Sequence, residues 1–272
     1  MKKRKKAQSY LAKKIKQFAS VLIYVLLFLW FPPVRWVLSY IGFWIMYFLN
    51  YYYSKIKNRI EVFGEENIPR DTGALLFSNH HTLIDSLFIC GIYVRRRDMF
   101  FHQKRIPWNT PDAKNFFSHW LGKHIVKLLK CTPAKRKFSQ PSEFYEQIER
   151  WCNIIKNNNI LLYFEGGRSR CPDKPNEESI GICRKGVALT ILKGKPKYSI
   201  PVRLVNIDKI LPVTDKLSYK MSHGHKCKII FGPPVDFSDI WEAAISDDEK
   251  IELIKIRVRQ AVVDLAPDNN PE

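Results

Sequence analysis

The chain has 272 residues and a formal net charge of +19 at pH 7, from 45 basic and 26 acidic side chains. This length suffices for one sizeable hydrophobic core with an appendage, and the charge predicts an anionic partner: a membrane surface, a nucleic acid or a phosphorylated substrate. The six cysteines form no C-x-x-C pair and no metal-type spacing with histidine. This usage argues against a disulfide-stapled scaffold and indicates reduced thiols in a cytosolic setting.

The N-terminal segment predicts attachment to a membrane. Residues 1–17 carry eight Lys or Arg and no acid, and two uncharged runs of fourteen residues follow at 18–31 and 36–49. Fourteen helical residues span only about 21 Å, against about 30 Å for the hydrocarbon core of a bilayer. Pro32 and Pro33 would break or sharply kink a single helix between the runs. Basic residues flank both ends, which places both ends on the cytoplasmic side. We therefore expect a two-helix hairpin that enters one leaflet, with one true span as the alternative.

A signal peptide and a buried soluble hairpin both fit this segment less well. A secretory signal peptide has the same charge order, but no small-residue cleavage site follows. A buried soluble hairpin does not need Trp30, Trp36, Trp44 and the tyrosines at 51–53, which are typical of membrane interfaces. We expect a membrane protein whose main domain lies on the cytoplasmic face. The expected parts are a basic arm at 1–17, a membrane-associated helical hairpin at 18–53, an α/β domain at 54–265 and a tail at 266–272.

Beyond the hairpin, short apolar runs alternate with longer amphipathic segments. Short runs bounded by Gly, Pro or Asn are typical of buried strands, and apolar residues at intervals of three and four are typical of helices. In the last helix, Ser246 and Glu249 have the spacing of a capping box. The alternation predicts an α/β fold with a mixed, largely parallel sheet flanked by helices. The predicted elements, in chain order, are strand 59–63, strand 74–79, helix 83–94, strand 99–102, helix 116–129, helix 141–157, strand 160–164, helix 181–192, strand 199–205, strand 227–231 and a helix from 246 to about 265.

The stretch 79–85, Asn-His-His-Thr-Leu-Ile-Asp, lies between a predicted strand and a predicted helix and contains a candidate catalytic pair. His80 would lie in the turn and Asp85 in the first helical turn, with Thr82 as the helix N-cap at capping-box spacing. On one continuous helix the two side chains would lie about 140° apart, but from the turn the imidazole can fold back onto the carboxylate. That pairing would fix the tautomer and stabilise the imidazolium, as a general base requires. The same spacing also arises by chance, and Asp85 could be only a cap.

A second candidate site follows the strand at 160–164. Residues 165–170, Glu-Gly-Gly-Arg-Ser-Arg, begin where the strand ends. Glycines allow backbone N–H groups to approach an anion closely, and each guanidinium can bind a phosphate through two hydrogen bonds. The segment therefore predicts an anion cradle, although a surface turn with solvated charges has the same composition.

Together these stretches resemble four ordered motifs of the glycerolipid acyltransferases, the family typified by 1-acyl-sn-glycerol-3-phosphate (lysophosphatidate) acyltransferases. Residues 79–85 match the first motif, Asn-His-x-Ser-x-x-Asp, with threonine in place of the usual serine. Residues 133–136 are similar to the second motif, which ends in a phosphate-binding arginine, and residues 163–169 to the third, Phe-Pro-Glu-Gly-Thr-Arg-Ser. Residues 200–202, Ile-Pro-Val, fit the fourth motif. The resemblance covers about residues 58–240.

The resemblance implies an O-acyltransferase that moves a fatty acyl group from an acyl thioester to the hydroxyl of lysophosphatidate, giving phosphatidate in phospholipid synthesis. His80 would be the general base and Asp85 would orient it. No metal or other cofactor is implied, and acyl-CoA or acyl-carrier protein would be the co-substrate. The residues implied at the acceptor phosphate are Arg168, Glu165, Gly166 and Arg136, with Lys104, Asn79, Gly167 and Ser169 as further candidates.

Departures from the motifs leave alternatives open. Phe164 and Gly167 replace the Pro and Thr of the third motif, a form more similar to glycerol-3-phosphate acyltransferases. A glycerol-3-phosphate or other lysophospholipid acyltransferase is therefore the alternative, and lysophosphatidate is preferred because the first motif is of the Asn-His type. The alternative from another class is a non-enzymatic basic protein that binds membrane or nucleic acid. The basic arm adjoins an apolar segment and no nucleic-acid motif is present, so anionic lipid is the expected partner. The other six histidines, His81 among them, are expected to be packing or surface residues.

Overall fold

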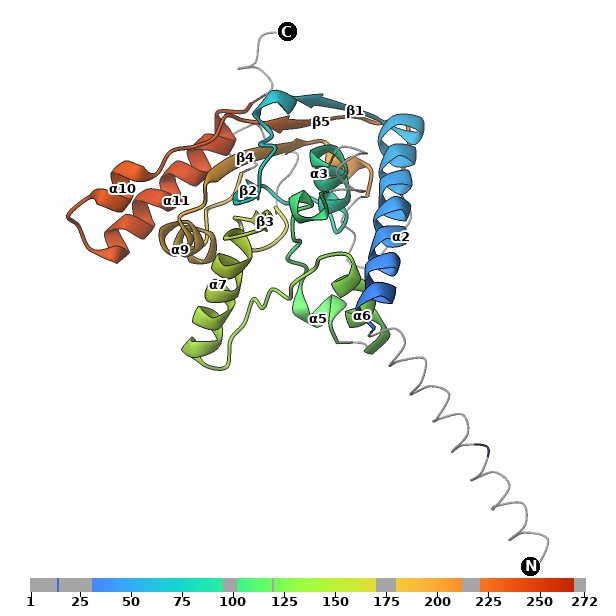
Figure 1. Ribbon diagram of the computed structural model, residues 1–272. Coiled ribbons are helices and arrows are strands. Elements are labelled where there is room, and N and C mark those ends of the chain that lie inside the picture. Colours follow the sequence, from blue (N-terminus) through green and yellow to red (C-terminus); the bar gives the residue numbers. More distant parts are fainter. Residues whose placement is uncertain are drawn as a thin grey trace, which may run out of the picture.

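A five-stranded sheet in the order β1-β5-β4-β2-β3 forms the centre of the main domain (Figure 1). The computed structural model describes Lys14 and residues 31–94, 102–118, 120–169, 180–211 and 221–266. β2 pairs in parallel with β3 and β4, β1 pairs in parallel with β5, and β4 and β5 are antiparallel. The predicted mixed, largely parallel sheet is therefore confirmed. The strands are β1 Arg59–Phe63, β2 Ala74–Ser78, β3 Ile160–Tyr163, β4 Tyr198–Val205 and β5 Lys226–Phe231.

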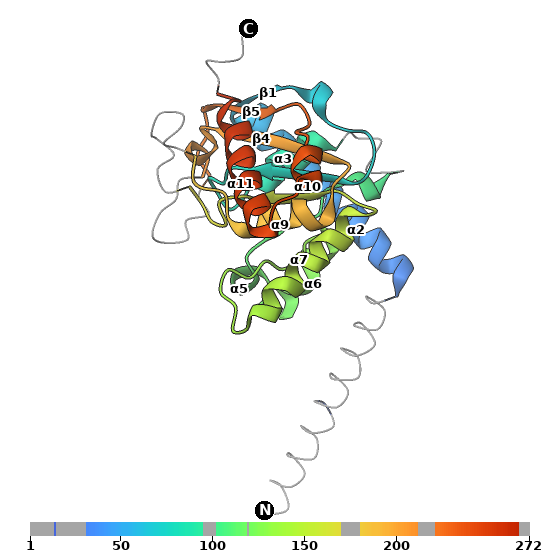
Figure 2. The ribbon, with the colours of Figure 1, turned by 90° about the vertical axis from the view of Figure 1, so that its left-hand side faces the viewer.

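Helices cover both faces of the sheet, as predicted for an α/β fold (Figures 1 and 2). Because side chains alternate along a strand, Leu75 and Phe77 of β2 face one side, while Ala74 and Leu76 face the other. The first pair packs with α7, α9 and α11 in one core cluster, and the second pair packs with α3 in another. The helices are α2 Pro32–Tyr51, α3 Asp85–Tyr93, α5 Ala113–Phe116, α6 Trp120–Leu128, α7 Pro141–Ile155, α9 Lys185–Gly194, α10 Ser238–Glu242 and α11 Asp247–Val263.

α2 forms most of the described part of the N-terminal segment. Phe31 is extended and two prolines occupy the first helical turn, so α2 begins where the sequence predicted a break. The helix packs on α3 and α6 and continues as a π-helix, Tyr52–Lys57. Large apolar side chains along this helix are exposed, namely Trp36, Val37, Ile41, Ile45, Phe48 and Leu49. Ile41, Ile45 and Phe48 form its outer face, opposite the buried Phe43.

The predicted hairpin is only partly covered by the structure. Its first uncharged run, 18–31, lies outside the described residues except for Phe31. Among the helices that are described, none combines the length and the apolar character needed to cross a bilayer. The two-helix hairpin stays a prediction.

Several predicted element boundaries were wrong. Of the helix expected at 116–129, Phe116 is the last residue of α5 and residues 120–128 form α6. The helix expected at 181–192 begins only at Lys185, because the preceding residues pair with the loop after β3: Gly181 N–H donates to the Glu165 carboxylate and Arg184 N–H to the Phe164 carbonyl. α10 was not predicted. Of the strand expected at 99–102, only His102 is described, and it precedes a 3-10 helix, Gln103–Arg105.

The capping box predicted for the last helix is present. The Ser246 side chain accepts from Glu249 N–H, and the Glu249 carboxylate accepts from Ser246 N–H at 2.9 Å. The four apolar residues predicted to form its inner face are all buried, and they pack against the β2 face that carries Leu75: Ile251, Ile254, Val258 and Val262. Local sequence therefore specified this helix well.

Candidate active site

The two candidate motifs meet because they follow neighbouring parallel strands. Ser78 of β2 is paired in register with Tyr163 of β3, so His80 and Glu165 each lie two residues beyond a strand end, at the same edge of the sheet. The carboxyl ends of parallel strands are where open α/β sheets place their ligands. A hydrogen bond joins the two loops directly: Ser169 N–H donates to the His80 carbonyl at 2.6 Å.

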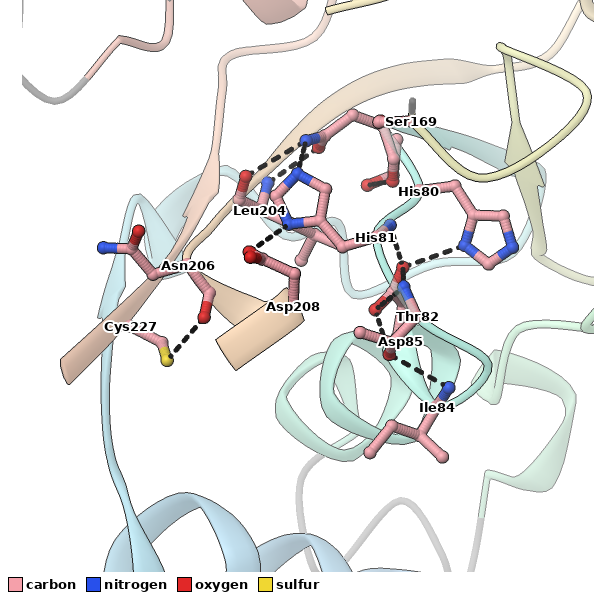
Figure 3. A network of polar contacts seen from close by, with 12 residues as sticks. His80, His81, Thr82, Ile84, Asp85, Ser169, Leu204, Asn206, Asp208 and Cys227 are labelled. Carbon is pink, nitrogen blue, oxygen red and sulfur yellow. Dashed lines mark hydrogen bonds and ion pairs between the residues drawn. The ribbon is translucent and has the colours of Figure 1, made fainter. Parts of the chain in front are cut away.

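The imidazole of His80 pairs with Asp85 across the turn, as the sequence predicted. Nδ1 of His80 lies 2.8 Å from Oδ2 of Asp85. The same carboxylate accepts from His81 N–H at 2.6 Å, from Thr82 N–H at 3.0 Å and from the Thr82 hydroxyl at 2.6 Å. Because the fully buried carboxylate acts as an acceptor towards all these groups, Nδ1 of His80 carries the proton. Nε2 is then left as a base, and Figure 3 shows this nitrogen pointing away from Asp85.

The environment keeps Asp85 ionised. Burial by itself would raise the pKa of Asp85, but the hydrogen bond and charge of His80, aided by His81 and Thr82, outweigh burial and lower the pKa below its usual value. A carboxylate that stays charged inside the protein can stabilise an imidazolium beside it. The pair therefore has the electrostatics of a general base and its orienting partner.

The predicted capping box at Thr82 forms only in half. Thr82 N–H donates to the Asp85 carboxylate, which is one of the two bonds of a box. The Thr82 hydroxyl does not cap the helix; it accepts from Ile84 N–H at 3.2 Å and donates to Asp85. α3 consequently begins at Asp85, two residues later than predicted, and Ile84 is its N-cap residue. The Thr82 hydroxyl therefore binds the buried Asp85 carboxylate instead of capping the helix, as local sequence had predicted it would.

Tyr163 packs against His80, and the sequence did not predict this contact. The two rings stack with centroids 4.0 Å apart and an interplanar angle of 18°. The stack limits rotation of the imidazole, whose side chain is 12% exposed. Its only sequence signal was that Tyr163 is the first residue of the stretch that resembles the third motif.

Glu165 shapes the second loop. Its carboxylate accepts from the Ser169 hydroxyl at 2.7 Å and from Gly181 N–H at 2.8 Å. Burial raises the pKa of Glu165, and these hydrogen bonds only partly oppose burial. Gly166 has φ 67°, in the left-handed region that favours glycine. These contacts make Glu165 a brace of the loop, and its expected place at the acceptor phosphate stays a prediction.

Two arginines lie at this loop, as expected from the motifs. Arg136 Nε pairs with Asp112 Oδ2 at 3.0 Å, and a methyl group placed on Gly167 would lie 3.7 Å from Arg136 Nη1. Both arginines are exposed, and Arg168 is the neighbour of Ser169, whose N–H binds the His80 carbonyl. The structure thus brings the second and third motifs together beside the first. The binding roles of Arg136 and Arg168 stay predictions.

The remaining candidates have different surroundings. Lys104 is exposed in the 3-10 helix Gln103–Arg105, and its carbonyl accepts from Lys130 Nζ at 3.3 Å. Asn79 is buried and ties the turn to β4: its side-chain oxygen accepts from Leu204 N–H at 2.8 Å and its amide donates to the Leu204 carbonyl at 3.0 Å. Within the described residues, no three His, Cys, Asp or Glu side chains gather as they would around a metal ion.

Comparisons with known proteins bear on the fold and the family of the chain. One structural match is described as the 1-acyl-sn-glycerophosphate (LPA) acyltransferase PlsC from Thermotoga maritima, with a TM-score of 0.53 and 18% identity over 86% of this chain and 80% of that chain. At this identity the likeness shows the fold alone. A search of curated proteins gave no match. The family model described as Acyltransferase matches residues 59–204, more than half of the chain and the part that holds all four motifs. The chain therefore belongs to the acyltransferase family and is an acyltransferase.

Proposed function

We propose that the chain is a membrane-associated acyltransferase that moves a fatty acyl group from acyl-CoA or acyl-carrier protein to the hydroxyl of lysophosphatidate, giving phosphatidate. The observation that carries the proposal is the position of the His80–Asp85 pair, 2.8 Å apart, beside the loop that bears Arg168 and lies next to Arg136. A base and a phosphate-binding cradle at one sheet edge suit a phosphorylated alcohol as acceptor.

In the proposed reaction, Nε2 of His80 takes the proton of the acceptor hydroxyl as its oxygen attacks the thioester carbonyl carbon. The imidazolium is stabilised by Asp85, whose carboxylate stays ionised. The tetrahedral intermediate then collapses, the carbon–sulfur bond breaks, and the leaving thiolate takes the proton back from Nε2. The base is thereby regenerated, and no acyl-enzyme forms.

The acceptor phosphate would lie against Arg136 and Arg168. A guanidinium binds phosphate with two charge-assisted hydrogen bonds, which fixes orientation as well as affinity. Arg136 is already held by Asp112 at 3.0 Å, so its side chain is partly organised before substrate arrives. Gly167 leaves space beside this guanidinium.

The acyl chain would enter an apolar cavity between α2 and α3. Ser86 and Leu87, which directly follow the catalytic carboxylate, line it together with Met46 of α2 and Leu129. Most of the lining is apolar, which suits a hydrocarbon chain. The thioester carbonyl would then lie near His80 at the start of α3.

The outer face of α2 would contact the bilayer. Ile41, Ile45 and Phe48 lie opposite Phe43, which packs in the same core cluster as α3. Basic residues stand at both ends of the helix, with Arg35 at one end and Lys55 and Lys57 beyond the other. Such a helix binds an interface through its apolar face, and nearby cations favour anionic lipid. We place the catalytic domain on the cytoplasmic face of the membrane.

The test is acyl transfer by the purified, detergent-solubilised full chain, with radiolabelled acyl-CoA and a panel of acceptors: lysophosphatidate, glycerol 3-phosphate and lysophospholipids with a head group. We expect labelled phosphatidate, and loss of the product in His80→Ala with vesicle binding retained. Preferential labelling of glycerol 3-phosphate would replace the acceptor named here. Full turnover in His80→Ala would overturn the mechanism.

A further inference from the structure

A second histidine in the catalytic turn has buried polar contacts that the mechanism above does not use. His81 is 4% exposed, and its Nε2 lies 3.0 Å from Nδ2 of Asn79. Its other ring nitrogen, Nδ1, faces Oδ1 of Asp208 at 3.5 Å (Figure 3). The ring thus lies between the end of β2 and the 3-10 helix Ile207–Lys209, which follows β4.

The hydrogen bonds of Asn79 determine the protonation state of this ring. The Asn79 side-chain oxygen accepts from Leu204 N–H, so its amide nitrogen faces the Leu204 carbonyl and His81. An amide nitrogen only donates, so Nε2 of His81 must be an acceptor without a proton. The proton of a neutral ring then lies on Nδ1, which has no hydrogen-bond partner among the described residues and lies 3.5 Å from Oδ1 of Asp208. If the Asn79 amide were reversed, its nitrogen would face Leu204 N–H and its oxygen would face the Leu204 carbonyl. Both buried hydrogen bonds to Leu204 would then be lost.

The backbone of His81 connects this cluster to the catalytic pair. His81 N–H donates to Oδ2 of Asp85 at 2.6 Å, the same oxygen that binds Nδ1 of His80. A displacement of the His81 ring would therefore move a donor of the catalytic carboxylate. A hydrogen bond attaches the 3-10 helix that carries Asp208 to β5. The carbonyl of Asn206, the N-cap residue of this helix, accepts from the Cys227 thiol at 3.2 Å.

We propose that His81 is a positioning residue for acyl transfer: as the Nδ1–H tautomer, it fixes the turn that bears His80 and Asp85 to the end of β4 through Asn79, while Nδ1 faces the Asp208 carboxylate without a hydrogen bond. Asn79 is the anchoring contact, because 3.0 Å is a hydrogen-bond distance, whereas Nδ1 makes no hydrogen bond to Asp208 at 3.5 Å. The kinetic test of this inference rests on the proposed acyl transfer, whereas the test of the tautomer by NMR does not.

Two amide substitutions separate the two contacts of the ring. In His81→Gln the side-chain oxygen reaches the position of Nε2 and can still accept from Asn79. In His81→Asn the amide reaches only the position of Nδ1, so one N–H of the Asn79 amide loses its partner, while the other still donates to the Leu204 carbonyl. We expect kcat within about threefold of wild type for His81→Gln and a fall of about tenfold or more for His81→Asn, with the KM for lysophosphatidate unchanged in both.

Three further measurements complete the test. His223→Gln, at an exposed position before β5, is the matched control and should leave kcat unchanged. Thermal unfolding of each variant separates lost positioning from lost folding. Nitrogen-15 NMR of histidine-labelled wild-type protein in detergent micelles should show His81 with its proton on Nδ1, assigned by loss of the signal in His81→Gln.

The outcomes distinguish this inference from the proposed function. Equal kcat for His81→Asn and His81→Gln, a change confined to KM, or a ring protonated on Nε2 would each overturn the positioning role. A wild-type chain inactive with every acceptor would refute the proposed function instead, and the NMR spectrum would still decide the tautomer.

Discussion

The backbone of Ser169 donates a hydrogen bond of 2.6 Å to the carbonyl of His80, although the two residues belong to different loops. This bond holds the loop after β3, which contains Gly166 and Gly167, against the turn that bears His80. It forms because β2 and β3 are parallel neighbours in register, so both loops leave the sheet at one edge. The chemistry proposed for the chain depends on that proximity.

Replacing Asp85 with asparagine should lower kcat by about 100-fold or more. The carboxylate accepts from His80, His81 and Thr82, and an amide nitrogen in its place would oppose one of these donors and leave the imidazolium without its counter-charge. Steady-state acyl transfer measures the effect. Asp71→Asn, at an exposed surface ion pair with Lys197, is the control and should retain full activity. A normal kcat in Asp85→Asn would remove Asp85 from the mechanism.

Glu165 should make the folded state less stable as pH rises. Burial raises its pKa above the ordinary 4.5, so its favourable contribution is complete below pH 4.5 and is lost as pH rises through the higher pKa of the folded state. Glu165→Gln cannot ionise, so its melting temperature should rise relative to that of wild type as pH increases above 4.5. Thermal unfolding across this range gives the comparison. A difference between the two proteins that does not change with pH would contradict the raised pKa.

Arg136→Ala should raise the KM for lysophosphatidate by about tenfold, with a smaller change in kcat, because it removes a charge-assisted contact to phosphate. Folding should persist, since Asp112 keeps its bonds from Lys114 and Asn115 N–H at the start of α5. Lys137→Ala removes the next exposed cation and should leave KM unchanged. With a monoacylglycerol, which lacks the phosphate, Arg136→Ala and wild type should not differ. A KM effect equal for both acceptors would place the phosphate elsewhere.

Met46→Trp should shift the preference of the enzyme toward shorter acyl chains. The side chain lines the apolar cavity between α2 and α3, and a larger ring there would fill space that a long chain needs. Competition between long and medium acyl-CoA measures the ratio of kcat/KM values. Ile45→Trp, one residue away on the exposed face of α2, is the control. Equal shifts in the two variants would indicate that the cavity does not hold the chain.

Charges on the outer face of α2 should weaken vesicle binding by about tenfold or more, because apolar side chains then no longer enter the interface. The double variant Ile41→Glu, Phe48→Glu changes two exposed positions on that face. Flotation with vesicles containing anionic lipid measures binding. Ile256→Glu, on the exposed side of α11, should float like wild type. Unchanged flotation of the double variant would place the membrane contact on another part of the chain.

Much of the fold could be predicted from local patterns. β1 has the predicted bounds, and the last helix has its predicted cap and buried face, because apolar period and side-chain caps act within a few residues. Errors arose where a distant group changed the local outcome. Gly181 to Arg184 are not helical because they pair with the loop after β3, and Thr82 serves Asp85 rather than the helix end. His81 was expected to be an ordinary packing or surface residue and is buried between Asn79 and Asp208.

The sequence by itself determined the α/β class, the acyltransferase family and the pairing of His80 with Asp85, since that pair spans one turn and needs no other part of the chain. Only the tertiary structure decided which loops adjoin that pair. The order of strands and their register follow from packing between segments far apart in sequence, and these contacts leave no periodic trace in any one segment. The positions of Ser169, Arg136 and Asp208 around the catalytic turn therefore could not be read before the sheet was known.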